Sequence, residues 1–449
     1  MSDTIRVMIQ MKSTPALAAA AYGPFSSAPL SFLSEMPGVD FDTGYSPVPL
    51  YMPQNGEPSM FSMGSFGNNG EETYVVRASV AQEYIDRLLE RTHNDENVVG
   101  IFADVAVQPI AAKCPSGPIG TQHDVASLLN VAMLQQNGMD GTGVKAVIVD
   151  TGVNLNYLRA QGVSPAFDET LSWAPSHGQP LGAMPVGHGT MCAYDTLIAA
   201  PRCTLIDHAL LTSNSRGGSI MEGLLSDAVR SYAILHSYLM RAPSHFAGDG
   251  FPRTLVVNNS WGMFHPSWDY PVGSPMNYSD NPRHVFNIAV AQLEAAGADI
   301  LFAAGNCGPQ CADNRCQGVV DAGIYGANSH ECVLTVAGVK IDRDRIGYST
   351  VGPGRLSTQK PDVACYTHFA GSGVYAADGG TSAATPVLTG VIAAIRRIYP
   401  SHVVSPGALR DAIRNSARSS KGIGFDYEYG YGVIDVDNLV LELKARFGP

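Results

Sequence analysis

The stretch VKAVIVDTGVN (144–154) contains an unbroken run of apolar, mostly β-branched residues that stops at Asp150. Such a run predicts a strand that is buried on both faces of a sheet. Four further strands of this kind follow, with helical spacing between and after them. The strands are expected at 203–211, 254–260, 299–306 and 332–339, and the helices near 189–200, 219–241, 283–297, 382–398 and 406–418. This alternation predicts an α/β fold with a mostly parallel, doubly wound sheet.

The composition is that of a large globular protein. The chain has 449 residues, of which 45% are hydrophobic and 15% charged, so it has room for a large core and a second, smaller unit. Its net charge is −12, and no cluster of Lys and Arg occurs, so we expect no nucleic-acid partner. No run of 18 or more apolar residues occurs, and we expect no membrane partner either.

The region before the α/β domain predicts a small α+β domain over residues 1–112. Its Pro-, Gly-, Ser- and Met-rich stretch 23–72 is interpreted as an insertion. Residues 113–122 have the composition of a linker, and the α/β domain is expected at 123–449. Within the small domain, strands are expected at 5–11, 73–79 and 98–109, and a helix within 80–95.

Polar residues follow the predicted strands or begin the predicted helices. Asp150 and Asn306 come directly after strands, His188 lies between two glycines, and Ser382 begins a helix in DGGTSAATP (378–386). Taken singly, each residue fits a turn or a packing role. Together they form the inventory of acyl transfer: a hydroxyl nucleophile, its histidine base, a carboxylate that orients the base, and an amide that stabilises the oxyanion.

Five blocks that contain these residues resemble the signature blocks of the subtilisin-like serine proteases (subtilases, peptidase family S8). The blocks are DTGVN (150–154), GHGT (187–190), NNSWG (258–262), AAGN (303–306) and GTSAATP (380–386). Their order Asp, His, Ser is the order of that family. The resemblance extends over residues 123–449, including YGYGVIDVDNLV (429–440), which is similar to the entry into the family's C-terminal helix.

The resemblance implies a role for each matching residue. Ser382 would be the nucleophile, His188 the general base and then acid, Asp150 its orienting carboxylate, and Asn306 the oxyanion donor. One edge of the substrate cleft would comprise Ser260, Trp261 and Gly262, the opposite edge Gly217, Gly218 and Ser219, and Gly305 would also contact the substrate. These edges would bind an extended peptide by strand addition.

The chain departs from the family pattern in two places. Ala383 follows the serine where the family usually has methionine, and NLNYLRA (154–160) lacks the usual His-Pro after the aspartate block. Neither departure removes a catalytic group. Cys192, four residues after His188, is interpreted as a buried structural thiol.

A cluster of cysteines follows the oxyanion asparagine, in the loop where the family's pocket wall lies. One or two disulfides are expected there, with free thiols and a zinc site as alternatives. The cluster consists of Cys307, Cys311, Cys316 and Cys332.

The first 110 residues resemble the family's inhibitory propeptide, a ferredoxin-like α+β module. The resemblance implies that the domain inhibits its own catalytic domain and that the segment after it lies in the cleft like a product. The alternative is a permanent accessory domain. The resemblance implies no required cofactor, and structural calcium is an expectation from the family alone. No clear signal peptide is legible, which favours the cytoplasm, whereas the eight cysteines are compatible with secretion.

The leading functional hypothesis is a serine endopeptidase that is autoprocessed or inhibited by its N-terminal domain, with peptides or proteins as substrates. The same residues would also serve a peptide ligase or macrocyclase, or a leader-peptide maturation protease of a peptide-natural-product pathway. A ligase needs a lid that excludes water, for which the loop 262–282 is a candidate. A peptide-binding pseudoprotease is the third hypothesis, which the four filled catalytic positions disfavour.

Overall fold

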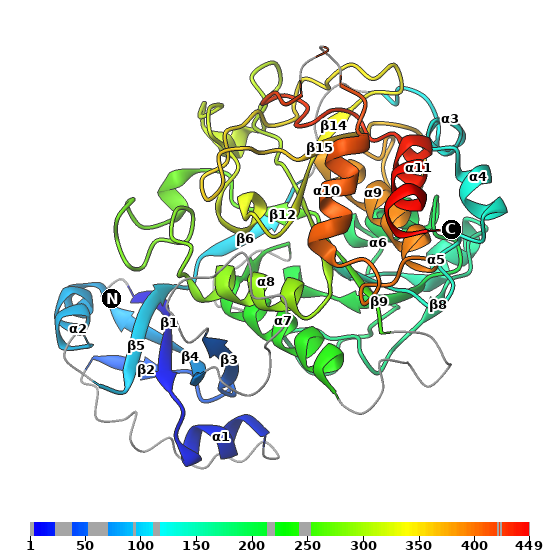
Figure 1. Ribbon diagram of the computed structural model, residues 1–449. Helices are drawn as coiled ribbons and strands as arrows, with labels where there is room; N and C mark the ends of the chain where they lie inside the picture. Colours follow the sequence, from blue (N-terminus) through cyan, green and yellow to red (C-terminus); the bar gives the residue numbers. More distant parts are fainter. Residues whose placement is uncertain are drawn as a thin grey trace.

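The structure of the chain is a computed structural model (Figure 1). It describes residues 4–22, 38–52, 71–92, 96–110, 117–212, 221–241, 253–419, 422 and 424–448. Within these residues, no helix has both the length and the apolar character that crossing a membrane requires.

A seven-stranded parallel sheet forms the centre of the large domain, which confirms the predicted fold class. The strand order is β15-β14-β13-β11-β7-β9-β8. The strands are β7 (Lys145–Val149), β8 (Ala166–Phe167), β9 (Thr204–His208), β11 (Leu255–Asn259), β13 (Asp299–Ala303), β14 (Leu334–Val339) and β15 (Val363–Tyr366). Because all seven are parallel, their carboxyl ends meet at one edge of the sheet, where Asp150 and Asn306 lie.

Helices cover both faces of this sheet. On β7, Ala146 and Ile148 belong to one hydrophobic core, and Val147 and Val149 belong to the other. The first core contains α6 (His188–Leu197) and α9 (Thr381–Arg396), and the second contains α7 (Leu225–Met240) and α8 (Val285–Ala295). The other helices of the large domain are α3 (Gln122–Leu128), α4 (Val131–Gln136), α5 (Leu155–Ala160), α10 (Pro406–Ser416) and α11 (Val436–Phe447).

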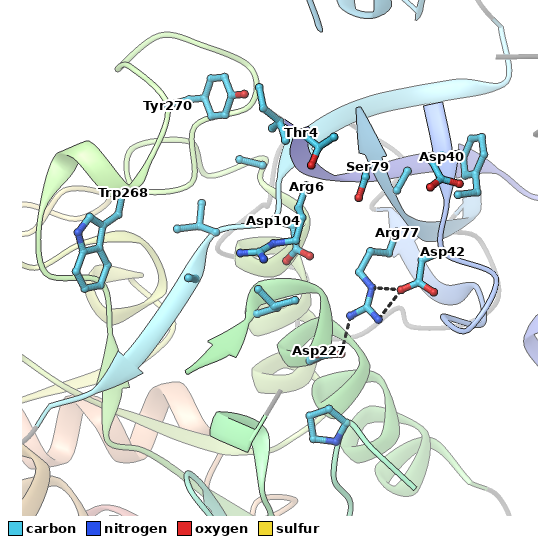
Figure 2. Close-up of a pocket in the computed structure, with 18 of the residues that line it drawn as sticks. Thr4, Arg6, Asp40, Asp42, Arg77, Ser79, Asp104, Asp227, Trp268 and Tyr270 are labelled. Carbon is cyan, nitrogen blue, oxygen red and sulfur yellow. Dashed lines mark hydrogen bonds and ion pairs between the residues drawn. The ribbon is translucent and has the colours of Figure 1, made fainter. Parts of the chain in front are cut away.

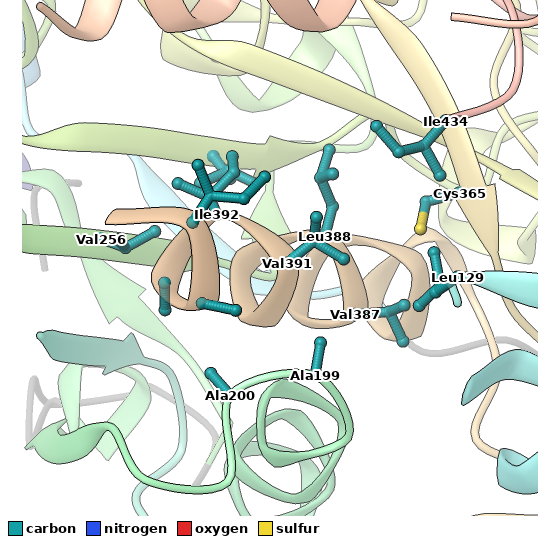
Figure 3. Close-up of a cluster of buried hydrophobic side chains, with 14 of the residues drawn as sticks. Leu129, Ala199, Ala200, Val256, Cys365, Val387, Leu388, Val391, Ile392 and Ile434 are labelled. Atoms are coloured by element: carbon teal, nitrogen blue, oxygen red, sulfur yellow. The ribbon is translucent and has the colours of Figure 1, made fainter. Parts of the chain in front are cut away.

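Helix α9 is the central helix of the first core. All of its residues are buried, and Val387, Leu388 and Val391 pack among side chains from several elements (Figure 3). Small residues in α6 and in α9 let the two helices approach closely, because Gly390 has no side chain to meet the Thr196 backbone. This packing places the first residues of both helices, His188 and Ser382 among them, near the same sheet edge.

The N-terminal domain contains an antiparallel sheet. Along the chain, a strand and a helix come first, three strands follow, and a helix and a last strand end the domain. Its strands have the order β2-β4-β1-β5, and β3 also pairs with β4. The elements are β1 (Thr4–Lys12), α1 (Pro15–Tyr22), β2 (Val39–Phe41), β3 (Val48–Met52), β4 (Glu71–Ala81), η2 (Gln82–Tyr84), α2 (Ile85–Thr92) and β5 (Val98–Ala103). Thus the described part of the stretch 23–72 contributes two strands to the sheet.

This sheet lies against helices α7 and α8 of the large domain, so that both contribute to one core. A groove of about 1090 Å³ runs along the contact (Figure 2). Arg77 of β4 pairs with Asp42 of its own domain at 2.7 Å and, across the contact, with Asp227 of α7 at 3.1 Å. Asp104 accepts hydrogen bonds at 2.8 Å from both the backbone N–H and the hydroxyl of Ser226, at the start of α7.

The expected strand 98–109 divides at Asp104. Residues up to Ala103 form β5 in the N-terminal sheet, and β6 (Ala106–Pro109) continues into the large domain. There β6 is the middle strand of a three-stranded antiparallel sheet, between β10 (Gly223–Leu224) and β12 (Trp261–Gly262). The division is a long-range effect, because the buried Asp104 is fixed by Ser226 in a different domain.

Docking of the N-terminal domain is expected to depend on pH through Asp104. Burial raises the pKa of this carboxyl from 3.8 to about 6, the hydrogen bond from Ser226 opposes the shift, Asp227 adds to it, and Arg77 opposes it. Between about pH 4 and pH 6, the separated domain ionises while the docked one stays protonated. The free energy of docking should therefore become less favourable as the pH rises through this window, by up to about 3 kcal/mol. Above the window it should not change further.

The measurement is the unfolding temperature of the N-terminal domain in the intact full-length chain, between pH 4 and pH 7. Asp104→Asn should flatten the profile. Asp40→Asn removes an exposed carboxylate of the same groove and serves as the matched control. An unchanged slope in Asp104→Asn would contradict the assignment.

Candidate active site

Asp150 and His188 form a buried pair at the carboxyl edge of the parallel sheet. Asp150 follows β7, and His188 is the first residue of α6. The imidazole Nδ1 lies 2.9 Å from Oδ1 and 3.0 Å from Oδ2 of the carboxylate. Both side chains are at most 1% exposed. The carboxylate therefore holds the ring with Nδ1 protonated, which leaves Nε2 as the acceptor nitrogen.

Ser382 lies in the first turn of α9, next to this pair. The Cys192 thiol is in contact with all three residues: its Sγ lies 3.7 Å from Asp150 Oδ2, 3.9 Å from His188 Nδ1 and 3.6 Å from the Ser382 carbonyl oxygen. Cys192 is fully buried, as expected, and burial raises the pKa of its thiol, so the thiol stays protonated.

The donor atoms of Asp150, His188 and Cys192 lie within 4.8 Å of one another, which is close enough for a metal ion. However, the carboxylate and Nδ1 already bond each other, and a protonated thiol is a poor ligand. The donor set thus fits a hydrogen-bonded acid–base pair better than a metal site.

Asn306 lies after β13, with its amide in a fixed orientation. Its Oδ1 accepts the backbone N–H of Thr381 at 3.0 Å, so its Nδ2 points the other way. Nδ2 donates to the carbonyl oxygen of Ile110 at 3.3 Å. An amide donor held in this way is suited to stabilise negative charge that develops on a substrate carbonyl.

The chain's own segment 106–110 occupies the cleft. Ile110 donates its backbone N–H to the Ser260 carbonyl at 3.1 Å, and its carbonyl oxygen contacts both Ser382 Oγ and Asn306 Nδ2. In the same structure His188 Nε2 has no hydrogen-bond partner among the described residues. The Ile110 carbonyl oxygen thus lies between the Ser382 hydroxyl and the Asn306 amide.

The structure places one predicted cleft edge beside this segment. Trp261 pairs with Pro109, and Gly262 pairs with Gln108. The Trp261 side chain does not face the cleft: it is fully buried against Phe286 and Phe302. Trp261 therefore meets the segment through its backbone. A Cβ on Gly262 would lie 2.9 Å from the Asn328 amide nitrogen, which explains the glycine there.

The opposite edge next to β6 is β10, where Gly223 pairs with Val107 and Leu224 with Ala106. The sequence did not predict β10, because the strand has only two residues and no local pattern besides its glycine marks it as a strand. The predicted residues of that edge, Gly217, Gly218 and Ser219, lie outside the described residues. Gly305 has φ of +108°, and the Thr381 hydroxyl accepts its backbone N–H at 3.0 Å, which fixes the backbone next to Asn306.

The Ile110 side chain packs into an apolar pocket with Phe264, Ala303, Cys307 and Cys316. Cys307 and Cys316 form a disulfide that closes this wall. Cys311 is also disulfide-bonded, whereas Cys332 is a free thiol, so the disulfide hypothesis applies to three of the four cysteines. Phe264 was not predicted, because nothing in its local sequence marks it as a pocket residue.

The loop 262–282, a candidate lid, is fixed by internal hydrogen bonds. The Asp269 carboxylate accepts the backbone N–H groups of Tyr278 and Ser279 at 3.0 and 2.7 Å. The Met276 carbonyl accepts the N–H of Ala103, the last residue of β5. Through this hydrogen bond the loop contacts the N-terminal sheet.

Gly380→Ala is expected to lower kcat by roughly 10²-fold, because a Cβ at this position would lie 2.6 Å from the Ile110 carbonyl oxygen and 2.9 Å from Asn306 Nδ2. The matched control is Gly162→Ala. Gly162 has φ of +83°, close to the +81° of Gly380, but nothing lies within 4 Å of its Cβ position. Both variants place an alanine at a positive φ, so both carry the same backbone strain. Equal rates of peptide hydrolysis by the two would show that crowding around the Ile110 carbonyl oxygen has no effect.

Comparison with known proteins relates this chain to one family. A model of the subtilase family matches residues 141–432. Subtilisin DY of Bacillus licheniformis is 24% identical over 314 residues, which cover 69% of this chain and 95% of that protein. Fervidolysin of Fervidobacterium pennivorans is 26% identical over 325 residues, 66% of this chain and 40% of that protein. The fervidolysin crystal structure has the same fold with a TM-score of 0.59 at 14% identity, covering 98% of this chain and 61% of that one.

Proposed function

This chain belongs to the subtilase family of serine-type endopeptidases, and we propose that it cleaves peptide bonds through an acyl-enzyme on Ser382. In the first step His188 Nε2 takes the hydroxyl proton as Ser382 Oγ attacks the scissile carbonyl. Asp150 holds the imidazole and stabilises the imidazolium, and Asn306 Nδ2 stabilises the oxyanion. The imidazolium then protonates the leaving amine, and water resolves the acyl-enzyme by the reverse sequence. These groups need no cofactor.

One observation supports this proposal above the others: the Ile110 carbonyl oxygen contacts Ser382 Oγ and Asn306 Nδ2 while Ile110 N–H binds Ser260. A peptide bound as a substrate would present its scissile residue in this way. We therefore propose that the enzyme cuts its own Ile110–Ala111 bond. Residues 1–110 would then be an inhibitory propeptide whose last strand, β6, blocks the cleft until it leaves, and the catalytic domain would begin after this bond.

Intact-mass spectrometry of the purified chain over several hours tests the proposal. The expected result is conversion into fragments 1–110 and 111–449, at a rate independent of protein concentration because the cut is intramolecular. After the cut has freed the cleft, a serine-reactive fluorophosphonate should label Ser382. A chain that hydrolyses peptides yet stays whole would have a permanent N-terminal domain, and a chain that does neither would contradict the proposed function.

The Cys307–Cys316 disulfide supports folding in an oxidising compartment, so we propose secretion or export in place of the cytoplasmic expectation. The bond forms a wall of the pocket around Ile110. Fractionation of the producing cells, with the thiol state of the protein measured by alkylation, would test this. A fully reduced protein in the cytoplasm would contradict it.

A further inference from the structure

A charged cluster outside the Asp150–His188–Ser382 site lies against the docked segment 106–110. Arg315 belongs to the short helix η5 (Asn314–Cys316), and Asp313 holds its guanidinium at two points. The Nε–Oδ1 distance is 2.9 Å, and the Nη2–Oδ2 distance is 3.1 Å. The Asp313 side chain is only 3% exposed. A two-point contact with a buried carboxylate fixes the plane of the guanidinium and leaves its Nη1 to face the segment.

Nη1 contacts the two residues that precede Ile110. It donates to the backbone carbonyl of Pro109 at 3.0 Å and to the side-chain Oε1 of Gln108 at 3.2 Å. The first contact is available to any peptide, since every residue has a carbonyl. The second requires a side chain with an acceptor atom. Arg315 thus combines a general contact with a selective one.

The same guanidinium also supports the pocket for the scissile residue. Its Cζ lies 3.6 Å from the centroid of the Phe264 ring, and that ring packs with Ile110. The loop is fixed at both ends, because Cys316, the next residue, forms the disulfide with Cys307, and the Asp313 N–H donates to the Asn306 carbonyl at 2.9 Å. These contacts hold the cluster independently of the peptide, which lowers the entropic cost of binding.

We propose that Arg315 is a substrate-binding residue that selects extended peptides with a side-chain hydrogen-bond acceptor two positions before an aliphatic scissile residue. The inference rests on the proposed function, because it treats residues 106–110 as a bound substrate. Arg315 binds the backbone carbonyl of the residue that precedes the scissile residue. It also recognises the side chain of the residue before that one. Asp313 positions the guanidinium.

The test is a double-mutant cycle between enzyme and substrate. The substrate is Ala-Val-Gln-Pro-Ile joined to 7-amino-4-methylcoumarin, the sequence of residues 106–110, and its partner has Leu in place of Gln. Arg315→Met keeps the length of the side chain without its donors. It should raise KM and lower kcat/KM for the Gln peptide about 10- to 100-fold, with kcat changed less. The wild type should prefer Gln over Leu about fivefold, and the variant less than twofold.

Arg418→Met is the matched control, since Arg418 also pairs with an aspartate, Asp435, and its described contacts are made near the C-terminal helix. Arg315→Lys keeps the charge and should recover part of the loss. Equal Gln preference in wild type and Arg315→Met would overturn the proposal, even with peptide hydrolysis intact. If no peptide is cut, the proposed function fails, and Arg315 is tested in the intact Ser382→Ala chain.

In that chain, hydrogen exchange of residues 106–110 reports how firmly the segment is held, without any catalysis. Arg315→Met should speed the exchange about tenfold, and Gln108→Leu should have a smaller effect that disappears in the double variant. Unchanged exchange in Arg315→Met would overturn the inference whatever the activity of the enzyme.

Discussion

Ser382→Ala should lower turnover by about 10⁶-fold and leave the chain uncut at Ile110–Ala111, the size of loss that a subtilisin nucleophile shows. The physical reason is that Ser382 Oγ is the hydroxyl in contact with the Ile110 carbonyl oxygen. Without it, His188 and Asp150 have no nucleophile to activate. Asn306 would still stabilise negative charge on a substrate carbonyl, which sets a small residual rate.

The measurement pairs intact-mass spectrometry with hydrolysis of a peptide substrate. Ser416→Ala is the matched control, because Ser416 is a buried serine of α10 whose hydroxyl donates to the Ile413 carbonyl. It should process itself and turn over as the wild type does. If Ser382→Ala retains more than about a thousandth of wild-type turnover, another residue is the nucleophile and the acyl-enzyme proposal fails.

Asn306→Ala should lower kcat by roughly 10²- to 10³-fold with little change in KM, the effect of removing such a donor from a subtilisin. The loss falls on kcat because charge develops on the carbonyl oxygen only in the transition state. In the structure, Asn306 Nδ2 is the side-chain donor to the Ile110 oxygen, while its Oδ1 is used by the Thr381 N–H. Single-turnover acylation with an activated ester separates this step from product release.

A second substitution separates the electrostatic role from a structural one. Asn306→Asp keeps an oxygen for the Thr381 N–H but places a carboxylate beside the developing oxyanion. If stabilisation of the oxyanion is the role, Asp should be at least as damaging as Ala. Recovery of activity in Asn306→Asp relative to Asn306→Ala would mean that the Thr381 hydrogen bond is what matters.

The sequence predicts the parts of this protein that local patterns determine. Asp150, His188, Asn306 and Ser382 each lie at the end of a strand or the start of a helix, and a parallel sheet brings such ends together without further information. The apolar runs predict the central strands for the same reason. Family resemblance then connects the four residues to one reaction.

The features that the sequence did not predict depend on contacts between residues far apart in the chain. Strands β2 and β3 form in a Pro- and Gly-rich stretch only because β4 offers them an edge. The strand β10 has two residues and depends on β6. Trp261 was expected at an edge of the cleft, and its indole is buried in the core. Arg315 acquires its contacts from the loop that the Cys307–Cys316 bond closes.

The position of β6 has a consequence for how this enzyme could change over evolutionary time. If the enzyme cuts after its own Gln108-Pro109-Ile110, as we propose, each molecule must accept residues 108–110 as its first substrate. A mutation that reshapes the Ile110 pocket or removes the Arg315 contacts would then slow the enzyme's own maturation unless residues 108–110 change with it. Under this proposal specificity and maturation would evolve together, because a change in one alone would leave the N-terminal domain attached.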